Sequence, residues 1–139
     1  MSDCIFCKIV AGEIPCTKVF EDDQCLAFMD INPISAGHTL LIPKKHYELI
    51  TEMPADEAAH LGRHLPAMAR AVRDAMKATA LNILQNNGRV AGQAVGHMHI
   101  HFIPRWADDG LGFRWPAKPA DFAMLAKQAE AIRAGLRSM

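Results

Sequence analysis

Three histidines spaced two residues apart are the clearest chemical signal in the sequence. His97, His99 and His101 alternate with apolar residues, and a period of two puts alternate side chains on opposite faces of a β-strand. We therefore predict a strand over 97–103 that carries three imidazoles on one face and ends at Pro104, which has no N–H to donate. Such a row can be incidental polarity, a metal site or a catalytic site, because neutral imidazole is both a metal ligand and a base.

A second signal is the pair Cys4 and Cys7 near the N-terminus. The Cys-x-x-Cys spacing is typical of half a tetrahedral zinc site or of a redox dithiol. A redox dithiol usually follows a strand and opens a helix within a βαβ unit, which this position does not supply. Zinc is therefore favoured, and it needs two further ligands. Cys16 and Cys25 lack such spacing and are expected to be small apolar residues.

Length and charge exclude several classes of function. The 139 residues are enough for one domain, predicted over 1–139. Fifteen basic residues balance fifteen acidic ones, so there is no positive field to attract a nucleic acid. The N-terminus lacks a basic region followed by an apolar run, and no apolar segment approaches the roughly 18 residues of a membrane span. We expect a cytoplasmic protein without nucleic-acid or membrane partners.

Hydrophobic patterns predict the elements that must position these side chains. Besides the histidine strand, strands are expected over 18–20, 25–29, 38–43 and 80–86. One long helix is expected from Pro54 to Met76 with a kink at Pro66, and a C-terminal helix with an apolar stripe begins near Phe122. A short helical turn is expected over 9–15.

Most of these strands are joined by short loops, and no βαβ alternation is present. This pattern indicates an α+β domain with a five-stranded, mainly antiparallel sheet. The loop over 87–94 carries two glycines directly before the histidine strand. Its backbone N–H groups can hold phosphate oxygens, although glycine loops are common and this signal alone is weak.

Several motifs together resemble the histidine triad family. The run His-Met-His-Ile-His-Phe-Ile at 97–103 is similar to the family signature, and Cys-Ile-Phe-Cys, Gly-His-Thr-Leu-Leu-Ile-Pro-Lys-Lys-His and Gly-Gln-Ala-Val-Gly-His match as well. The resemblance extends from Cys4 to about Arg105 and is weaker over the tail at 106–139. It is strongest to the nucleotide-binding branch that includes purine nucleoside phosphoramidases. It implies a homodimeric nucleotide hydrolase or transferase whose sheets and long helices meet across the twofold axis.

The resemblance also implies roles for individual residues. His99 matches the nucleophile that attacks the α-phosphorus, His101 matches the neighbour that contacts the phosphate, and His38 matches a further histidine of the active site. In this reaction neutral imidazole attacks phosphorus and forms a nucleotidyl-histidine that water then opens.

Four more residues resemble the family's nucleotide-binding positions. Asp30 matches the acid that binds ribose hydroxyls, although it can also be a turn residue at a strand end. Asn86 and Gln93 match polar residues beside the phosphates. Ala94 departs from the pattern, because many relatives have a serine there whose hydroxyl bonds an α-phosphate oxygen.

The same resemblance implies the missing zinc ligands. Relatives with these cysteines use the histidine of the Pro-Lys-x-His motif and the first histidine of the triad, which are His46 and His97 here. Together with Cys4 and Cys7 they would hold one zinc ion per chain. A site with four protein ligands has no open position, so its role would be structural.

Three functions remain open at this point. The leading hypothesis is a hydrolase that releases a nucleoside 5′-monophosphate, of the AMP or GMP type, from an amine or a similar leaving group. A second is a dinucleoside polyphosphate hydrolase with the same nucleophile. A third is a zinc-bearing nucleotide-binding adaptor with little turnover, but binding alone would need no nucleophile.

Overall fold

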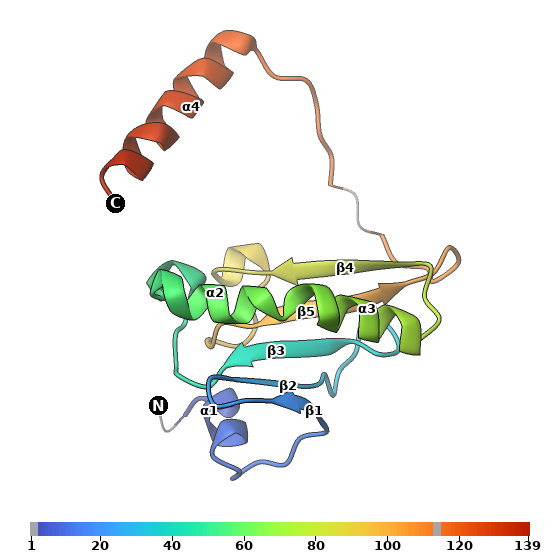
Figure 1. Ribbon diagram of the computed structural model, residues 1–139. Coiled ribbons are helices and arrows are strands. Elements are labelled where there is room, and N and C mark those ends of the chain that lie inside the picture. The colour runs from blue at the N-terminus through green and yellow to red at the C-terminus, as the bar shows by residue number, and fades with distance from the viewer. Residues whose placement is uncertain (1–2, 113–114) are drawn as a thin grey trace. The chain divides into compact units, whose positions relative to one another are not determined.

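The computed structural model describes residues 3–112 and 115–139 (Figure 1). The chain divides into two compact units, the first ending at Asp109 and the second beginning at Gly110. We describe each unit by itself. The predicted single domain over 1–139 corresponds most closely to the first unit, which holds the whole sheet, and the second unit falls within the tail that resembles the family less.

The first unit is built on one five-stranded antiparallel sheet. The strands are β1 Lys18–Glu21, β2 Cys25–Met29, β3 Thr39–Pro43, β4 Ala80–Gln85 and β5 Ile100–Arg105. Their order is β1-β2-β3-β5-β4, and every neighbouring pair is antiparallel. The predicted α+β class and antiparallel sheet are confirmed.

The helices of the first unit differ in two places from the prediction. They are α1 Ile5–Val10, α2 Ala55–Arg63 and α3 Leu65–Ala75, with 3-10 turns η1 Ile50–Glu52 and η2 Arg89–Ala91. The predicted long helix is broken at His64, although α2 and α3 follow one another over the same face of the sheet (Figure 1). Pro66 explains the break, because a proline fits only the first turn of a helix. The predicted turn over 9–15 is also wrong, since α1 starts four residues earlier.

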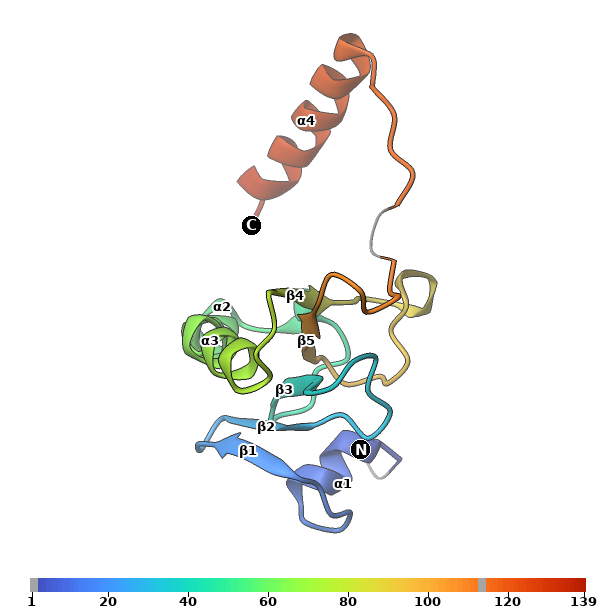
Figure 2. The ribbon, with the colours of Figure 1, turned by 90° about the vertical axis from the view of Figure 1, so that its right-hand side faces the viewer.

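The sheet is buried on both faces, and β2 shows how its side chains divide. Cys25 and Ala27 pack with the buried residues of α2 and α3, whereas Leu26 and Phe28 pack on the other face with Phe6 of α1. Figure 2 shows α2 and α3 on one side of the sheet and α1 on the other. Cys25, expected to be a small and only partly buried apolar residue, is fully buried.

The histidine strand begins later and ends later than predicted. β5 starts at Ile100, so only His101 lies within it, and His97 and His99 belong to the segment before it. β5 continues through Pro104. The Pro104 carbonyl accepts a hydrogen bond from the Ser35 hydroxyl on the edge of β5 that faces away from β4, so this residue does not interrupt the pairing with β4. The N–H group that a proline lacks would point to that same edge, beyond the end of the β3 pairing.

The second unit contains the predicted C-terminal helix, α4, over Phe122–Arg137. Its apolar stripe is exposed at Phe122, Leu125, Ile132 and Leu136. Among the described residues, no helix has the length and apolar character required to cross a membrane.

Candidate active site and metal cluster

The three histidines predicted to be catalytic converge on one cleft. His38 lies directly before β3, His99 directly before β5, and His101 within β5. All three line a cleft of about 380 Å³, as do Asp30, at the end of β2, and Ala94. The antiparallel pairing of β3 with β5 brings His38 beside His101, although the two residues lie far apart in the sequence.

Hydrogen bonds fix the proton positions on His38 and His101. The backbone N–H of Ile34 donates to Nδ1 of His38 over 3.0 Å, so that nitrogen carries a lone pair and the proton lies on Nε2. Nε2 of His38 is 2.9 Å from Nδ1 of His101 and donates to it. The proton of a neutral His101 therefore lies on its own Nε2, which becomes a hydrogen-bond donor.

His99 has the opposite arrangement. Its Nδ1 lies 2.7 Å from the backbone carbonyl of His97, and a carbonyl can only accept, so Nδ1 carries the proton. Nε2 is left with a lone pair. The ring of Phe6 meets the imidazole edge-on, with 5.2 Å between centroids, and the His101 ring lies 4.8 Å away. One imidazole thus offers a lone pair beside another that offers an N–H.

Burial keeps these imidazoles neutral. It lowers the pKa of His99 and of His38 below the usual histidine value, although the Asp30 carboxylate opposes the effect. Burial, together with His99 and His38, lowers the pKa of His101 to about 4. At neutral pH the nucleophile candidate is unprotonated, which is the form that can attack phosphorus.

Asp30 lies at the mouth of this histidine network, as predicted from its place at the end of β2. Its Oδ1 accepts a hydrogen bond from the backbone N–H of Asn32 over 2.8 Å. Its Oδ2 is 3.5 Å from Nε2 of His38, too far for a strong hydrogen bond. The carboxylate is therefore positioned by its own loop, and it lines the cleft with one oxygen still available.

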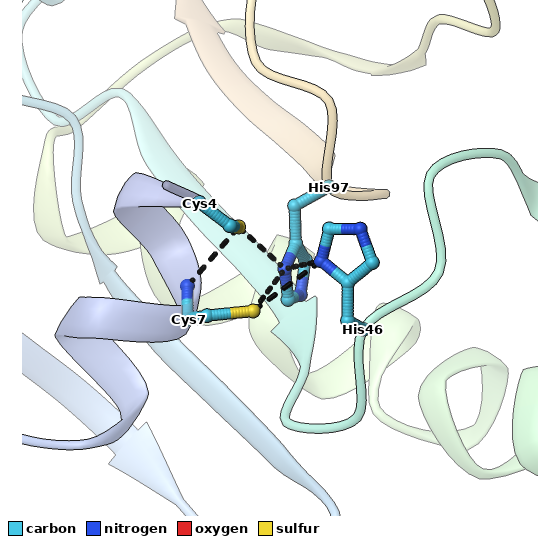
Figure 3. A group of neighbouring side chains, drawn as sticks. All are labelled: Cys4, Cys7, His46 and His97. Atoms are coloured by element: carbon cyan, nitrogen blue, oxygen red, sulfur yellow. Dashed lines mark hydrogen bonds between the residues drawn. The ribbon is translucent and has the colours of Figure 1, made fainter. Parts of the chain in front are cut away.

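The four predicted zinc ligands form a compact cluster (Figure 3). Cys4 Sγ lies 3.3 Å from His97 Nδ1, and Cys7 Sγ lies 3.3 Å from His46 Nδ1. The two Nδ1 atoms are 3.2 Å apart. Ligands of tetrahedral zinc are separated by about 3.3 Å for two nitrogens and about 3.6 Å for nitrogen and sulfur. These residues therefore fit a tetrahedral metal ion without rearrangement.

The surroundings of the cluster also suit a cation. Nε2 of His97 donates to the Pro43 carbonyl over 2.8 Å, which leaves Nδ1 free to act as a ligand. Burial and the neighbouring Cys4 thiol raise the pKa of Cys7 to about 11. Two thiols so close together become thiolates readily only when a cation takes the place of their protons.

Comparison with known proteins identifies the family. The model of the HIT domain family matches residues 11–108, more than half of the chain. This chain belongs to the HIT domain family. The adenosine 5′-monophosphoramidase hnt1 of Schizosaccharomyces pombe is 46% identical over 117 residues, which are 84% of this chain and 85% of that protein.

Two solved structures are similar to this chain in fold and sequence. SMU.412c from Streptococcus mutans has a TM-score of 0.93 at 47% identity, over 98% of this chain and 87% of that one. A zinc-bound histidine triad family protein from Mycobacterium smegmatis has a TM-score of 0.75 at 36% identity, over 99% of this chain and 97% of that one. The first supports the fold and the second shows zinc on a similar fold.

One apolar wall of the cleft was not predicted from the sequence. It is formed by Ile5, Phe6 and Ile9 of α1, and Ile31 and Ile34 of the loop after β2 also line the cleft. A signal was present, because four apolar residues lie within the six residues of α1. These side chains make most of the cleft lining apolar, and the histidines and Asp30 are among its polar groups.

Gln93 lies in the glycine loop and Asn86 lies directly before it, after β4, and neither is among the residues that line the cleft. Gln93 is buried and braces the loop, since its Oε1 accepts from the Gly88 N–H over 2.7 Å while its Nε2 donates to the carbonyls of Glu48 and Val95. Gly88 has a φ of 97°, a conformation that favours glycine. A direct phosphate contact by either side chain stays a prediction. Ala94 does line the cleft, without a hydroxyl.

The proton positions lead to a spectroscopic prediction. In the protein with ¹⁵N-labelled histidines, nitrogen chemical shifts at pH 7 should show the Nδ1–H tautomer for His99 and the Nε2–H tautomer for His101. His101 should remain neutral until the pH approaches about 4. In His38→Gln the hydrogen bond from His99 Nδ1 to the His97 carbonyl is kept, so the His99 tautomer should be unchanged. Titration of His101 near pH 6.5, or one tautomer for both rings, would contradict the arrangement.

The lowered pKa of His101 also has a consequence for stability. An unfolded histidine binds its proton near pH 6.5, but native His101 binds it only near about 4. The contribution of His101 to the free energy of unfolding is therefore complete above pH 6.5 and falls as the pH drops toward 4, by up to about 3 kcal/mol.

Proposed function

We propose that this HIT protein is a hydrolase that releases a nucleoside 5′-monophosphate from an amine or a similar leaving group. The observation that carries the proposal is the pair of opposite tautomers at the cleft. His99 presents the Nε2 lone pair as a nucleophile, and His101 presents an Nε2–H that can donate to a phosphate oxygen. A binding adaptor would need a donor but not the lone pair.

The proposed reaction has two displacements. Nε2 of His99 attacks the α-phosphorus and forms a P–N bond, while the bond to the leaving nitrogen breaks. That nitrogen keeps the electron pair, takes a proton from solvent and departs as the neutral amine; the attacking water of the second step returns one proton to solvent. The positive charge on the His99 ring is stabilised by the His97 carbonyl that accepts its Nδ1–H. Water then attacks phosphorus, the bond to His99 breaks, and neutral His99 and the nucleoside monophosphate are released.

The lining of the cleft supports the proposal of a nucleotide substrate. Its apolar wall, formed by Ile5, Phe6 and Ile9, offers a surface for a purine base, and the Asp30 carboxylate can accept hydrogen bonds from ribose hydroxyls. The name of the fission-yeast relative, an adenosine 5′-monophosphoramidase, supports the same chemistry. A dinucleoside polyphosphate would present the same α-phosphorus, so it is the rival substrate.

We also propose that Cys4, Cys7, His46 and His97 hold one structural zinc ion per chain. Their separations, which suit a tetrahedron, and the zinc-bound relative support it. When bound, the ion would fix the start of α1 to the segment that precedes β5 and would supply no reacting group.

The third proposal is a homodimer, which the edge strand β4 supports. Among the described strands β4 pairs with β5 alone, so its outer edge can offer backbone groups to a second copy. Ile83 of β4 is 46% exposed. By contrast, Leu61, Met68 and Val72 of α2 and α3 are already buried in their own core, so we place the dimer contact at this edge and not on the helices.

The covalent intermediate gives the first test of function. His99→Ala should lose at least about a thousandfold in the rate of adenosine phosphoramidate hydrolysis, because the bond-forming atom is gone, but should bind AMP within about tenfold of wild type. Acid-labile, base-stable nucleotidyl protein should accumulate in quenched wild-type reactions and not in His99→Ala. His101→Ala is the matched comparison, which should react slowly but still form the adduct.

Stereochemistry at phosphorus separates this reaction from direct attack by water. Double displacement predicts retention of configuration, and inversion would reassign His99 as a general base. A steady-state comparison of adenosine phosphoramidate with diadenosine polyphosphate then identifies the better leaving group.

Zinc removal is the second test. Elemental analysis should show about one zinc ion fewer per chain in Cys4→Ser than in wild type, and the melting temperature should fall because the ion links α1 to the sheet. Cys16→Ser serves as the matched control, since Cys16 lies outside the cluster. Loss of the ion with no change in melting temperature would rule out a structural role.

Oligomeric state is the third test. Light scattering at micromolar concentration should give about twice the 15.3 kDa of one chain. Ile83→Lys should yield a monomer, because a charge at the paired edge opposes strand addition. Val19→Lys should remain dimeric, since Val19 is 48% exposed on β1 at the opposite edge of the sheet. A wild-type mass of one chain would reject the dimer.

A further inference from the structure

A second group of metal-binding side chains lies on the other face of the sheet from the catalytic cleft. It consists of Asp22, in the turn between β1 and β2, Cys25, at the start of β2, His60, in α2, and His64, at the break between α2 and α3. We infer that these four residues form a second site for a zinc-class divalent ion. The inference does not depend on the proposed hydrolase or on the first metal cluster.

The distances within this group are those of a nearly assembled site. The ligand atoms of all four residues lie within 4.8 Å of one another. Nε2 of His60 is 2.7 Å and Nε2 of His64 is 3.1 Å from the same carboxylate oxygen, Oδ2 of Asp22. Neighbouring oxygen and nitrogen ligands of tetrahedral zinc are separated by about 3.3 Å. For these two imidazole–carboxylate pairs, separations that differ by a few tenths of an ångström would therefore admit an ion.

The backbone prepares Asp22 for this role. Its Oδ1 accepts hydrogen bonds from the N–H groups of Gln24 and Cys25, each over 2.8 Å. Burial opposes ionisation, but these bonds and the contact with His60 outweigh it and hold the pKa of Asp22 below its usual range. Oδ1 is thus used by the turn, and Oδ2 remains a charged ligand that points at both imidazoles.

The helix presents the two histidines together. His60 and His64 are four residues apart, so they lie on the same side of the helical path. Their rings meet edge-on with 5.2 Å between centroids, and the His64 ring also packs against Phe20 of β1. Both rings turn Nε2 toward Asp22, which is the shared direction that chelation requires.

Cys25 distinguishes a metal site from a simple pair of histidine–carboxylate hydrogen bonds. A thiol adds little to such hydrogen bonds, but it completes a set of one sulfur, two nitrogens and one oxygen, which suits zinc-class ions and not magnesium or calcium. Burial and Asp22 raise the pKa of Cys25 to about 12, so the ion would take the place of the thiol proton and release it to solvent.

Four protein ligands leave no open coordination position, so the ion would be structural. It would tie the β1–β2 turn to the break between α2 and α3. Pro66, in the first turn of α3, has no backbone N–H to donate there, and the linkage would hold α2 and α3 together at this break.

Metal titration of the full chain tests the inference. Protein stripped with a chelator should bind one equivalent of cobalt or zinc less in His64→Gln than in wild type, at micromolar metal. Glutamine retains a hydrogen bond to Asp22, and circular dichroism should confirm the native fold. Asp22→Asn should lose the same equivalent, whereas the neighbouring exposed residue Asp23 provides the matched control Asp23→Asn, which should lose none.

The cobalt spectrum assigns the site. Cys25→Ala should abolish one thiolate-to-cobalt charge-transfer contribution while the contribution of the Cys4 and Cys7 pair persists, and Cys4→Ser should do the reverse. Zinc should also raise the melting temperature of Cys4→Ser, which keeps the second site. It should not raise the melting temperature of the double variant Cys4→Ser/His64→Gln, in which both sites are impaired. Equal metal stoichiometry in wild type and in folded His64→Gln, or a cobalt spectrum that Cys25→Ala leaves unchanged, would overturn the inference.

Discussion

One short hydrogen bond, from Nδ1–H of His99 to the carbonyl of His97, determines what the cleft can do. It measures 2.7 Å and places the imidazole proton away from the cleft. If that proton moved to Nε2, the lone pair would point at the backbone, and the ring could only donate. The chemical role of His99 therefore depends on the backbone position of a residue two places earlier in the chain.

That residue, His97, also connects the cleft to the metal cluster. Its side chain is fully buried, with Nε2 bonded to the Pro43 carbonyl at the end of β3 and Nδ1 directed at Cys4. Its carbonyl holds His99. An ion in the cluster would act on the proposed nucleophile through this residue, by fixing its backbone.

Helix α1 is the other shared component. Its six residues are too few for a helix that is stable alone. Two contacts hold it, the Cys4 thiol that accepts the Cys7 N–H at its start and the burial of Phe6 between Phe28 and His99. One side of this short helix supplies metal ligands and another supplies the apolar wall of the cleft. Substitutions that loosen α1 will therefore affect both.

Much of this architecture can be predicted from sequence, because alternation and turn residues identify four of the five strands within about two residues. The errors have physical causes. The alternation of His97 and His99 matches a strand, but these residues leave the sheet in order to reach the cysteines and the cleft, and no local pattern encodes that. The sequence predicts a kink at Pro66 within one helix, but in the structure Pro66 lies in the first turn of a new helix, α3, and the break falls at His64.

The second metal cluster shows a different limit. His60 and His64 are four residues apart, but Asp22 and Cys25 lie between 35 and 42 positions before them in the chain. The turn between β1 and β2 meets the helical layer only in the folded sheet. Gln93 shows the same limit, because the sequence predicts a phosphate contact for its side chain, whereas its three hydrogen bonds in the fold go to backbone groups of Gly88, Glu48 and Val95.

The charge of the cleft bears on which phosphorus centre it would accept. Among the described residues that line it, there is no lysine or arginine, and the only charged side chain is the Asp30 carboxylate. The histidines are held neutral by burial. Neutral donors beside a carboxylate suit a phosphorus that carries one negative charge, as in a phosphoramidate or another substituted phosphate. A second negative charge on the phosphoryl group is disfavoured, because the Asp30 carboxylate would repel it and no cationic side chain among the lining residues would compensate. Under the proposed reaction, hydrolysis turns a singly charged centre into a doubly charged monophosphate, so the electrostatics that admit the substrate also favour release of the product.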